Sequence, residues 1–376
     1  MNDILILSFS DLEDDPRVNR QIGLLSGHYR VTAVGFADPK IDDVEFLRVD
    51  SGQKNIVSKI FAACKLKLGL FDSYYWNINL VKAVLQLLGN RQFDLVIAND
   101  LNTLPLAVRL AGKGKVVFDA HEYASLEFED LAFWRFFFKK YNDALCRLYL
   151  PRVHGMWTVC QGIADKYRQT YGVSSVVVTN APLYHDLQPT EVSDNRVRMI
   201  HHGAALPSRK LEIMIDAMRL LDDRYTLDLM LVANTSEYID QLKARAEGIK
   251  GVRFIPPVSM SQLSSFGNDY DVGIFLLPPT NFNYQHALPN KFFEFIQSRL
   301  CVAIGPSPEM AYLIKKYDCG IIANEFTAEA MANELKHLSS EKLRHYKQRA
   351  HVAAQDLCFD KNSEIVLGMV NKLLAN

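Results

Sequence analysis

The chain has 376 residues, of which 49% are hydrophobic and 23% are Asp, Glu, Lys or Arg. This is the composition of a globular protein, and it excludes wholesale disorder, a collagen-like repeat and a small disulfide-stapled protein. Lys and Arg number 42 and Asp and Glu 43, so the chain has no overall positive charge to hold a polyanion, and a dedicated nucleic-acid binder is disfavoured. We expect about two domains of roughly 100 to 200 residues each.

The cysteines and the first residues indicate a reduced, cytoplasmic protein. The sequence has no C-x-x-C pair, and its cysteines lie mostly in apolar runs, so we expect core thiols and neither a zinc site nor a disulfide framework. The chain opens MNDILILSFSDLEDD, in which acidic residues follow a short apolar run directly. This predicts a first strand and not a signal peptide, and no apolar run is long enough for a spanning helix. The cysteines are Cys64, Cys146, Cys160, Cys301, Cys319 and Cys358.

The first half of the chain predicts a doubly wound α/β domain, residues 1–185. Short runs rich in Ile, Val, Leu and Phe alternate with longer segments of helical period. The runs are continuously apolar, which is typical of parallel strands that are buried on both faces. They cover residues 4–9, 30–36, 95–98, 116–119, 156–160 and 176–179.

The second half predicts another domain of the same class, residues 186–360. A polar stretch without periodicity follows Asn180-Ala181-Pro182 and continues to Asn195, and it is the best linker candidate. The alternation of strands and helices then begins again. The predicted strands cover residues 198–202, 227–233, 252–255, 272–277, 302–304 and 320–323.

Two such domains would place the carboxyl ends of both sheets around a shared cleft, where ligands of doubly wound sheets usually bind. The last segment, residues 361–376, carries apolar side chains at helical spacing. We expect it to form a closing amphipathic helix that packs back toward the N-terminal domain. Its apolar residues are Ile365, Val366, Met369, Val370, Leu373 and Leu374.

The segment from His286 to Glu309 carries the clearest chemical signal. It follows a predicted strand and its loop, and Pro289 suits the first position of a helix. The start of a helix offers backbone N–H groups and the positive end of its dipole, and Lys291 adds a full charge in the first turn, an arrangement that suits a diphosphate. Asn290 and Glu294 share a helix face, so Glu294 could accept hydrogen bonds from sugar or ribose hydroxyls. An exposed helix start with a solvated Lys and Glu fits the spacing equally well.

The stretch LPNKFFEFIQSRLCVAIGPSPEM resembles the donor-binding segment of the group 1 (family 4) glycosyltransferases, which have the GT-B fold. Four further stretches resemble other parts of that family, and together they cover nearly the whole chain except about residues 38–91 and the last thirty. The resemblance implies two Rossmann-like domains and retaining transfer from a nucleotide-diphosphate sugar, with no metal ion and no cofactor. The four stretches are ILILSFSDLEDDPRVNRQ, FDLVIANDLNTLPLA with KVVFDAHEY, VCQGIADKYRQTYGVSSVVVTNAP and HHGAALPSRKLEIMIDAM.

The donor-binding segment departs from the family pattern at one position. Many members carry two glutamates seven residues apart, and the resemblance implies that the second, here Glu294, holds the donor ribose. The first would fall at His286, which could act as a neutral donor or acceptor, so the usual sugar preference does not carry over. Leu288, Pro289 and Asn290 belong to the same implied donor-binding segment.

A second departure follows His202. The family often has an arginine directly after the strand glycine, here Gly203, and a basic residue about six positions later, and both contact the diphosphate. This chain has Ala204 and then Arg209, or Lys210 if the loop is one residue longer. We expect Arg17, in the loop after the first strand, and Lys291 to compensate. Without the resemblance, pairing of Arg209 with an acidic residue of the next helix, Glu212 or Asp216, is favoured.

His121 ends the strand at residues 116–119 on its carboxyl edge, where we expect it to face the cleft. The resemblance implies that this histidine contacts the transferred sugar near its C6 hydroxyl, whereas a lone histidine is otherwise more often structural. Asp119 is expected to orient His121 or its loop. Asp15 is expected to cap the helix that Pro16 begins, and not to touch ligand.

Two segments of the first domain are candidates for an acceptor or membrane surface. Between Gln53 and Leu70, lysines surround an apolar stripe of period four, a pattern that suits a basic helix on an anionic bilayer, although a core-facing helix with a solvated lysine face is the more common source of such a pattern. The segment Phe133–Arg152 has more aromatic residues than a core helix requires, which favours an exposed patch for a lipid-linked acceptor. The lysines are Lys54, Lys59, Lys65 and Lys67, and the stripe is Ile56, Ile60, Cys64 and Leu68.

The sequence therefore predicts a retaining glycosyltransferase that transfers a sugar from a nucleotide-diphosphate sugar to a glycan or lipid-diphosphate-linked acceptor in bacterial surface polysaccharide synthesis. We expect it in the cytoplasm, with peripheral contact at the inner face of the membrane. The alternatives are a nucleotide-sugar 2-epimerase of the same architecture, a catalytically lapsed partner subunit and, disfavoured by the lack of a signal peptide, a solute-binding protein. No G-x-S-x-G, H-E-x-x-H, P-loop or G-x-G-x-x-G motif supports a hydrolase, zincin, NTPase or dehydrogenase.

Overall fold

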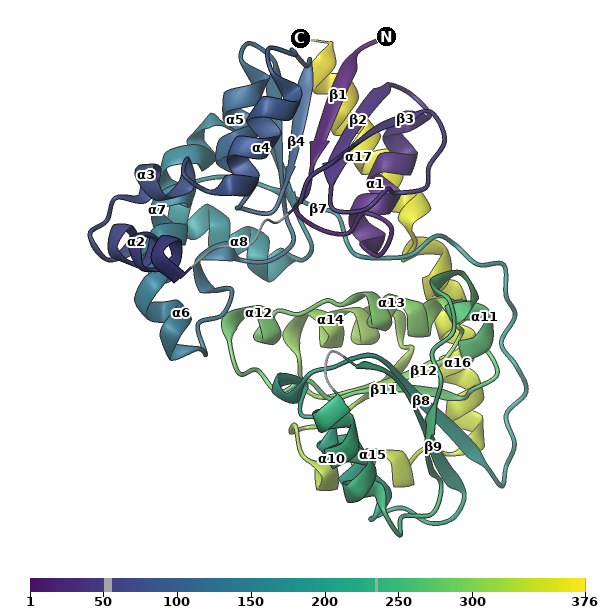
Figure 1. Ribbon diagram of the computed structural model, residues 1–376. Helices are drawn as coiled ribbons and strands as arrows, with labels where there is room; N and C mark the ends of the chain where they lie inside the picture. The colour runs from purple at the N-terminus through teal and green to yellow at the C-terminus, as the bar shows by residue number, and fades with distance from the viewer. Residues whose placement is uncertain (51–55, 234–235, 376) are drawn as a thin grey trace. The chain divides into compact units, whose positions relative to one another are not determined.

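The computed structural model describes residues 1–50, 56–233 and 236–375, without the side chains of residues 56–59. Its contacts divide the chain into two units (Figure 1). Unit 1 contains Met1–Thr179, Asn281–Asn283 and Ser363–Asn376, and unit 2 contains Asn180–Thr280 and Tyr284–Asn362. The boundaries expected from the sequence, at residues 185 and 360, lie within a few residues of these limits.

Unit 1 is built on a parallel sheet of seven strands in the order β3-β2-β1-β4-β5-β6-β7. The continuously apolar runs form its strands because parallel strands with helices on both faces have no solvent-facing side. β3 was not predicted, since it is an edge strand whose side chains are only partly buried. The strands are β1 Asp3–Leu7, β2 Arg30–Gly35, β3 Val44–Arg48, β4 Leu95–Asn99, β5 Lys115–Ala120, β6 Gly155–Thr158 and β7 Val176–Val177.

The strand order of unit 1 reverses between β1 and β4, so the loops after these strands diverge to opposite sides of the sheet and leave room for side chains between them.

The first helix begins as predicted, because Asp15 accepts a hydrogen bond from the Val18 N–H at 3.2 Å and Pro16 follows it. The helices are α1 Pro16–Ser26, α2 Ile56–Lys67, α3 Phe71–Tyr75, α4 Asn79–Leu88, α5 Leu104–Ala111, α6 Ala132–Phe137, α7 Lys139–Tyr149 and α8 Gln161–Tyr171, with 3-10 turns at Ala124–Leu126 and Leu150–Arg152.

The final helix, α17 Phe359–Leu374, completes the core of unit 1 with its residues from Ser363 onward. Val366 and Val370 are buried in one apolar cluster with side chains of β1, β2 and β4. The Tyr29 hydroxyl donates a hydrogen bond to the side-chain oxygen of Asn371. The segment that ends the chain is therefore part of the core that the first residues of the chain begin.

Unit 2 has a parallel sheet of six strands in the order β10-β9-β8-β11-β12-β13. Figure 1 shows α13 and α14 on one face of this sheet and α10 and α15 on the other. The strands are β8 Val197–Ala205, β9 Tyr225–Ala233, β10 Val252–Ile255, β11 Val272–Phe275, β12 Cys301–Ile304 and β13 Gly320–Ile322. The helices are α9 Glu212–Met218, α10 Ser236–Ala246, α11 Leu263–Gly267, α13 Asn290–Gln297, α14 Pro308–Tyr317, α15 Ala328–Lys336 and α16 Ser340–Asp356, with 3-10 turns at Pro207–Arg209 and Met260–Gln262. The short helix α12, Phe282–Gln285, is divided between the two units after Asn283. The predicted fold class, α/β with two doubly wound sheets, is confirmed.

The polar stretch that follows Asn180 has no helix or strand, but it is held against unit 2 by two buried basic side chains. The guanidinium of Arg299 donates to the backbone carbonyls of His185 and Leu187. The Lys347 ammonium donates to the Thr190 hydroxyl at 2.8 Å. Because backbone carbonyls satisfy these buried charges, the segment is fixed although it has no regular structure.

We predict that Val370→Ala destabilises the protein by about 1–3 kcal/mol, because it removes methyl groups from a fully buried position and leaves a cavity. Ile365→Ala, on the partly exposed side of the same helix, is the matched control and should cost less than about 1 kcal/mol. Urea denaturation of both variants measures the difference. Equal losses would show that α17 does not contribute its buried face to the core.

Candidate functional site

The carboxyl end of β8 and the start of α13 meet in unit 2, and both carry residues that the sequence singles out. The helix begins at Asn290, one residue later than predicted, because Pro289 keeps an extended backbone and precedes the helix. Lys291 and Glu294 are only 6% and 7% exposed. The alternative of an exposed helix start with a solvated Lys and Glu is therefore wrong.

Among its described neighbours, Lys291 has few groups that could balance its positive charge. Its Nζ is 4.3 Å from the centre of the Phe275 ring and 3.3 Å from Nε2 of His201. Burial and the charge of Arg209 lower the pKa of Lys291 well below its usual value, against the opposing effect of Glu294. An anion bound here would raise this pKa again, because it would supply the missing opposite charge.

His201 holds the lysine in place as a neutral ring. Its Nδ1 lies 2.9 Å from the backbone oxygen of Ile274, which can only accept, so Nδ1 carries the proton and Nε2 is free to accept from the Lys291 ammonium. Burial and the neighbouring Lys291 lower the pKa of His201 well below its ordinary value, which favours this neutral form. Sequence reasoning missed His201, although the histidine pair at the end of the predicted strand was a visible signal.

Glu294 lies beside the second of these histidines. Its Oε2 is 3.6 Å from Nε2 of His202, whose ring packs edge-on against Phe295. Burial and Lys291 lower the pKa of His202 to about 3, so this ring is neutral at physiological pH. The carboxyl group of Glu294 thus lies next to a polar but uncharged neighbour.

Gly203 and Arg209 complete the cluster. Gly203 has φ +117°, a backbone conformation that favours glycine, and a Cβ at this position would crowd Lys291 because it would lie 3.1 Å from its Nζ. Arg209 is partly buried and donates to the Ala204 carbonyl at 3.2 Å. Lys210 is exposed, with Nζ 4.0 Å from Glu212. Arg209 rather than Lys210 therefore lies with Lys291.

The pairing of Arg209 with an acidic residue of α9 does not occur among the described interactions. Asp216 forms two hydrogen bonds of 2.6–2.7 Å with Arg245. Glu212 accepts from the Tyr238 hydroxyl at 2.7 Å. The guanidinium of Arg209 is directed instead to the end of β8.

His286, at the position where the family has its first glutamate, contacts a carboxylate from another element. Its Nδ1 is 3.0 Å from Oε1 of Glu309, in the first turn of α14. Sequence reasoning missed Glu309 because it lies twenty-three positions away in the chain. Leu288 is buried and belongs to the packing beneath the segment. The donor-binding roles of His286, Leu288, Pro289 and Asn290 stay predictions.

In unit 1, His121 follows β5 and lies among acidic and amide groups at the carboxyl ends of β4 and β5. Its Nδ1 is 3.2 Å from Oδ2 of Asp100, and its Nε2 is 3.2 Å from Oδ1 of Asn99 and 3.7 Å from Asp119. Burial alone would lower the pKa of His121, but the carboxylates of Asp100 and Asp119 raise it to about 9. His121 is therefore an imidazolium at neutral pH, and both ring nitrogens donate.

Arg17 has a different place from the one expected. It is the second residue of α1, and its buried guanidinium binds both oxygens of Asp119 at 2.6–3.1 Å and the Val178 carbonyl at 2.8 Å. Burial would raise the pKa of Asp119, but Arg17 and His121 hold it at about 2. This geometry favours a structural role for Arg17 over a contact with the donor diphosphate, and Asp119 serves Arg17 first and His121 second.

The two candidate surface segments lie side by side in unit 1, because α2 contacts both α3 and α6. Phe61 and Leu68 of the first segment and Phe133 and Phe136 of the second are 64–72% exposed. The alternative of a purely core-facing helix is therefore wrong for Phe61 and Leu68. Lys54 lies outside the described residues, as do the side chains of Ile56 and Lys59. Cys64 is exposed, contrary to expectation, and the other five cysteines are buried thiols.

No helix in residues 56–233 or 236–375, or before residue 51, is long and apolar enough to cross a membrane. In the same part of the chain, no three His, Cys, Asp or Glu side chains gather so that they could hold a metal ion.

Solved structures with the same fold are GT-B glycosyltransferases, so the chain has the GT-B fold that the resemblance implied. HepE from Anabaena, in complex with UDP and glucose, matches with a TM-score of 0.71 and 15% identity over 99% of this chain and 100% of that chain. Sucrose-phosphate synthase from Thermosynechococcus elongatus matches with a TM-score of 0.75 and 12% identity over 100% of both chains. WaaG, a glycosyltransferase involved in lipopolysaccharide biosynthesis, matches with a TM-score of 0.69 and 13% identity over 97% of this chain and 100% of its own. No protein-family model and no curated protein matches the sequence.

The raised pKa of His121 predicts a pH-dependent contribution to stability. An unfolded histidine has a pKa of about 6.5, so the stabilisation is fully present below about pH 6.5 and is lost as the pH rises through about 9. We expect His121→Asn to lower Tm most at pH 6, by the equivalent of about 2–3 kcal/mol. The difference in Tm between His121→Asn and the parent should become steadily smaller toward pH 9.5.

Thermal unfolding at pH 6, 7, 8, 9 and 9.5 measures this gap, with His28→Asn, at an exposed position of the same unit, as the control. A gap that stays constant over this range would mean that His121 is not held as an imidazolium.

Proposed function

We propose that this protein is a glycosyltransferase that takes a sugar from a nucleotide-diphosphate sugar and transfers it to a glycan or lipid-linked acceptor. The observation that carries the proposal is the buried cluster of Lys291, Arg209 and Gly203 at the start of α13. Two cations lie there beside a helix start, with neutral histidines as their near neighbours. HepE, which shares the fold, was solved with UDP and with UDP-glucose, and this supports a nucleotide-sugar donor.

The cluster has the chemistry that a departing diphosphate requires. The first N–H groups of an α-helix have no partner within the helix, and the dipole of α13 adds positive potential at that end. Charges in a water-excluded site act more strongly than in water, so Lys291 and Arg209 stabilise the negative charge that develops on the leaving group. Glu294 accepts hydrogen bonds from the hydroxyls of the donor ribose.

In the proposed reaction, the oxygen of the acceptor hydroxyl forms a bond to the anomeric carbon while the bond from that carbon to the diphosphate oxygen breaks. The hydroxyl proton passes to the departing diphosphate. Retention of the anomeric configuration, and catalysis without a metal ion or cofactor, are what the family resemblance implies. For His121 the proposal keeps the contact with the transferred sugar.

We predict that one nucleoside diphosphate raises the Tm of the parent by several degrees and that Lys291→Met and Glu294→Ala abolish most of the shift, because a ligand that binds only the folded state stabilises it by mass action. Lys291→Met keeps an unbranched side chain that is one heavy atom shorter and removes its charge. The panel contains UDP, GDP, ADP and CMP, each with representative sugars attached, without metal.

Lys243→Met, at an exposed position of α10, is the control and should shift like the parent. Parental shifts in both site variants would refute the site assignment. A folded parent that no nucleotide stabilises would point to a lapsed subunit, and a free epimerised sugar formed without an acceptor would point to a 2-epimerase.

We also propose that α2 and α6 contact an anionic membrane from the cytoplasmic side during synthesis of a surface polysaccharide. Exposed aromatic side chains of both helices, Phe61, Phe133 and Phe136, lie in one region of unit 1 with Lys65 and Lys67 on α2. Aromatic residues that insert between headgroups and lysines that face anionic lipids are the two components of interfacial binding. The lipid-linked acceptor would be presented at this surface.

We predict that the parent floats with vesicles of phosphatidylethanolamine and phosphatidylglycerol and that the triple variant Phe61→Ser, Phe133→Ser, Phe136→Ser loses at least about tenfold in bound fraction. Lys65→Glu with Lys67→Glu should lose binding to the anionic vesicles in the same assay. The exposed apolar residues Leu220 and Tyr312 of unit 2, changed to Ser, provide the control. Failure of the parent to float would remove the membrane proposal and leave the donor site untouched.

A further inference from the structure

Unit 1 contains a pocket of about 590 Å³ that includes His121. Its walls come from the loops after β1, β4 and β5 and from α3, α6 and α7, all within this unit. The volume lies in the range of small-molecule sites and would hold one or two sugar rings. Of the residues proposed to contact the donor, His121 also lines this pocket, whereas Arg209, Lys291 and Glu294 of unit 2 do not.

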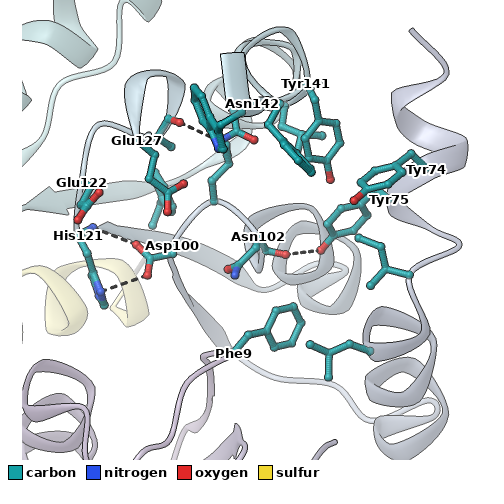
Figure 2. A pocket seen from close by; sticks show the side chains of 18 of the residues that line it. Phe9, Tyr74, Tyr75, Asp100, Asn102, His121, Glu122, Glu127, Tyr141 and Asn142 are labelled. Carbon is teal, nitrogen blue, oxygen red and sulfur yellow. Dashed lines mark hydrogen bonds and ion pairs between the residues drawn. The ribbon is translucent and has the colours of Figure 1, made fainter. Parts of the chain in front are cut away.

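One end of the pocket is acidic. Figure 2 shows Asp100, Glu122 and Glu127 gathered with His121 on one side of it. Burial, and the nearby carboxylates of Glu122 and Asp100, raise the pKa of Glu127 to about 8. At neutral pH Glu127 is therefore mostly protonated and can both donate and accept a hydrogen bond, while Asp100 and Glu122 are further acceptors for hydroxyl groups.

The other end is aromatic. Figure 2 shows Tyr74, Tyr75 and Tyr141 together on the side away from His121. Tyr75 is fixed, because its hydroxyl donates to the Asn102 carbonyl at 2.8 Å and accepts from the Leu106 N–H at 3.2 Å. Tyr74 packs edge-on against Tyr141, with ring centres 5.0 Å apart. Such rings offer flat apolar surface to the C–H faces of a sugar ring or to an alkyl chain.

The aromatic end continues toward α2. Tyr74 and Ile78 also line a smaller, mostly apolar hollow of about 250 Å³, whose other walls include Phe61 and Lys65 of α2. A ligand that fills the main pocket can therefore extend an apolar group past Tyr74 to the exposed side of that helix. The acidic end has no corresponding apolar continuation among the residues that line it.

We propose that this pocket binds the acceptor as an uncharged sugar with an apolar aglycone, with the sugar hydroxyls at Asp100, Glu122 and Glu127 and the aglycone along Tyr74, and that it rejects acidic or phosphorylated sugars. This inference rests on the proposed glycosyltransferase function and names its acceptor class. The carboxylates of Asp100 and Glu122 outnumber the single imidazolium of His121 and select against anions by repulsion, and the tyrosines contribute affinity that does not depend on which sugar is bound.

Direct binding without nucleotide tests the proposal. The probes are octyl glucoside, octyl galactoside and octyl N-acetylglucosaminide, with octyl glucuronide as the acidic counterpart of the glucoside, all below their micelle concentrations. Isothermal titration calorimetry gives the affinities. At least one neutral glycoside should bind, and the glucuronide should bind at least about tenfold more weakly than the glucoside, since a single like-charge repulsion in a partly buried site suffices for this factor.

Two sets of variants separate the acidic end from the aromatic end. Glu122→Gln with Glu127→Gln should reduce the discrimination against the glucuronide to about threefold or less, while Glu13→Gln, at an exposed position of the same unit, should leave it unchanged. Tyr74→Leu keeps an apolar side chain at a half-buried position and should weaken all octyl glycosides by about threefold to tenfold.

The proposal is overturned if no neutral glycoside of the panel binds, if the glucuronide binds as tightly as the glucoside, or if the glutamine variants leave the discrimination intact. Repeating the titrations with Lys291→Met separates this result from the donor site. Glycoside binding that persists in a protein with no nucleotide binding would leave the pocket assignment standing. Nucleotide binding without glycoside binding would remove the pocket assignment alone.

Discussion

Charges held away from water at the carboxyl ends of parallel strands set the properties of both units. A buried charge is costly unless a partner or hydrogen bonds compensate it, so each sheet must solve this problem with the residues that its topology brings together. In unit 1, the guanidinium of Arg17 compensates Asp119 from the first turn of α1. In unit 2, Lys291 has neutral histidines and an aromatic ring for its nearest described neighbours. The buried charge at the sheet edge is thus a carboxylate in unit 1 and an ammonium group in unit 2.

In the proposed reaction, this difference in the sign of the buried charge gives the two substrates different binding sites. The Arg17–Asp119 pair is complete without ligand, and breaking such a buried pair typically costs about 3–5 kcal/mol, so it is a fixed part of unit 1. The acidic groups around His121 then leave a surplus of acceptors, which suits hydroxyl donors. The cluster at Lys291 has a surplus of cations, and an anionic donor completes it. If the proposed function holds, a charged donor and an uncharged acceptor bind at different sheets.

The sequence predicted the strands well because buried parallel strands are continuous apolar runs, and the candidate residues that follow these strands lie together because such positions collect at one sheet edge. It could not predict β3, whose half-buried edge position leaves no clear pattern. It also did not predict the contacts of His201, Glu309 and Arg17. Each of these depends on a partner in another element, Ile274, His286 or Asp119, and chain distance carries no information on such contacts.

The two departures from the family pattern can be understood as local replacements. Where an arginine is missing at Ala204, the backbone carbonyl of that residue accepts a hydrogen bond from Arg209, which holds the remaining cation at the end of β8. Where a glutamate is missing at His286, the ring contacts Glu309 from the start of α14, so a carboxylate is still present but lies behind an imidazole. A sugar hydroxyl that reaches this position would meet a ring nitrogen in place of a carboxylate oxygen. Because Nδ1 of His286 contacts Glu309, a sugar would be recognised by a ring nitrogen whose position differs from that of the two oxygens of a carboxylate, and the preferred donor sugar need not be the one that the family usually takes.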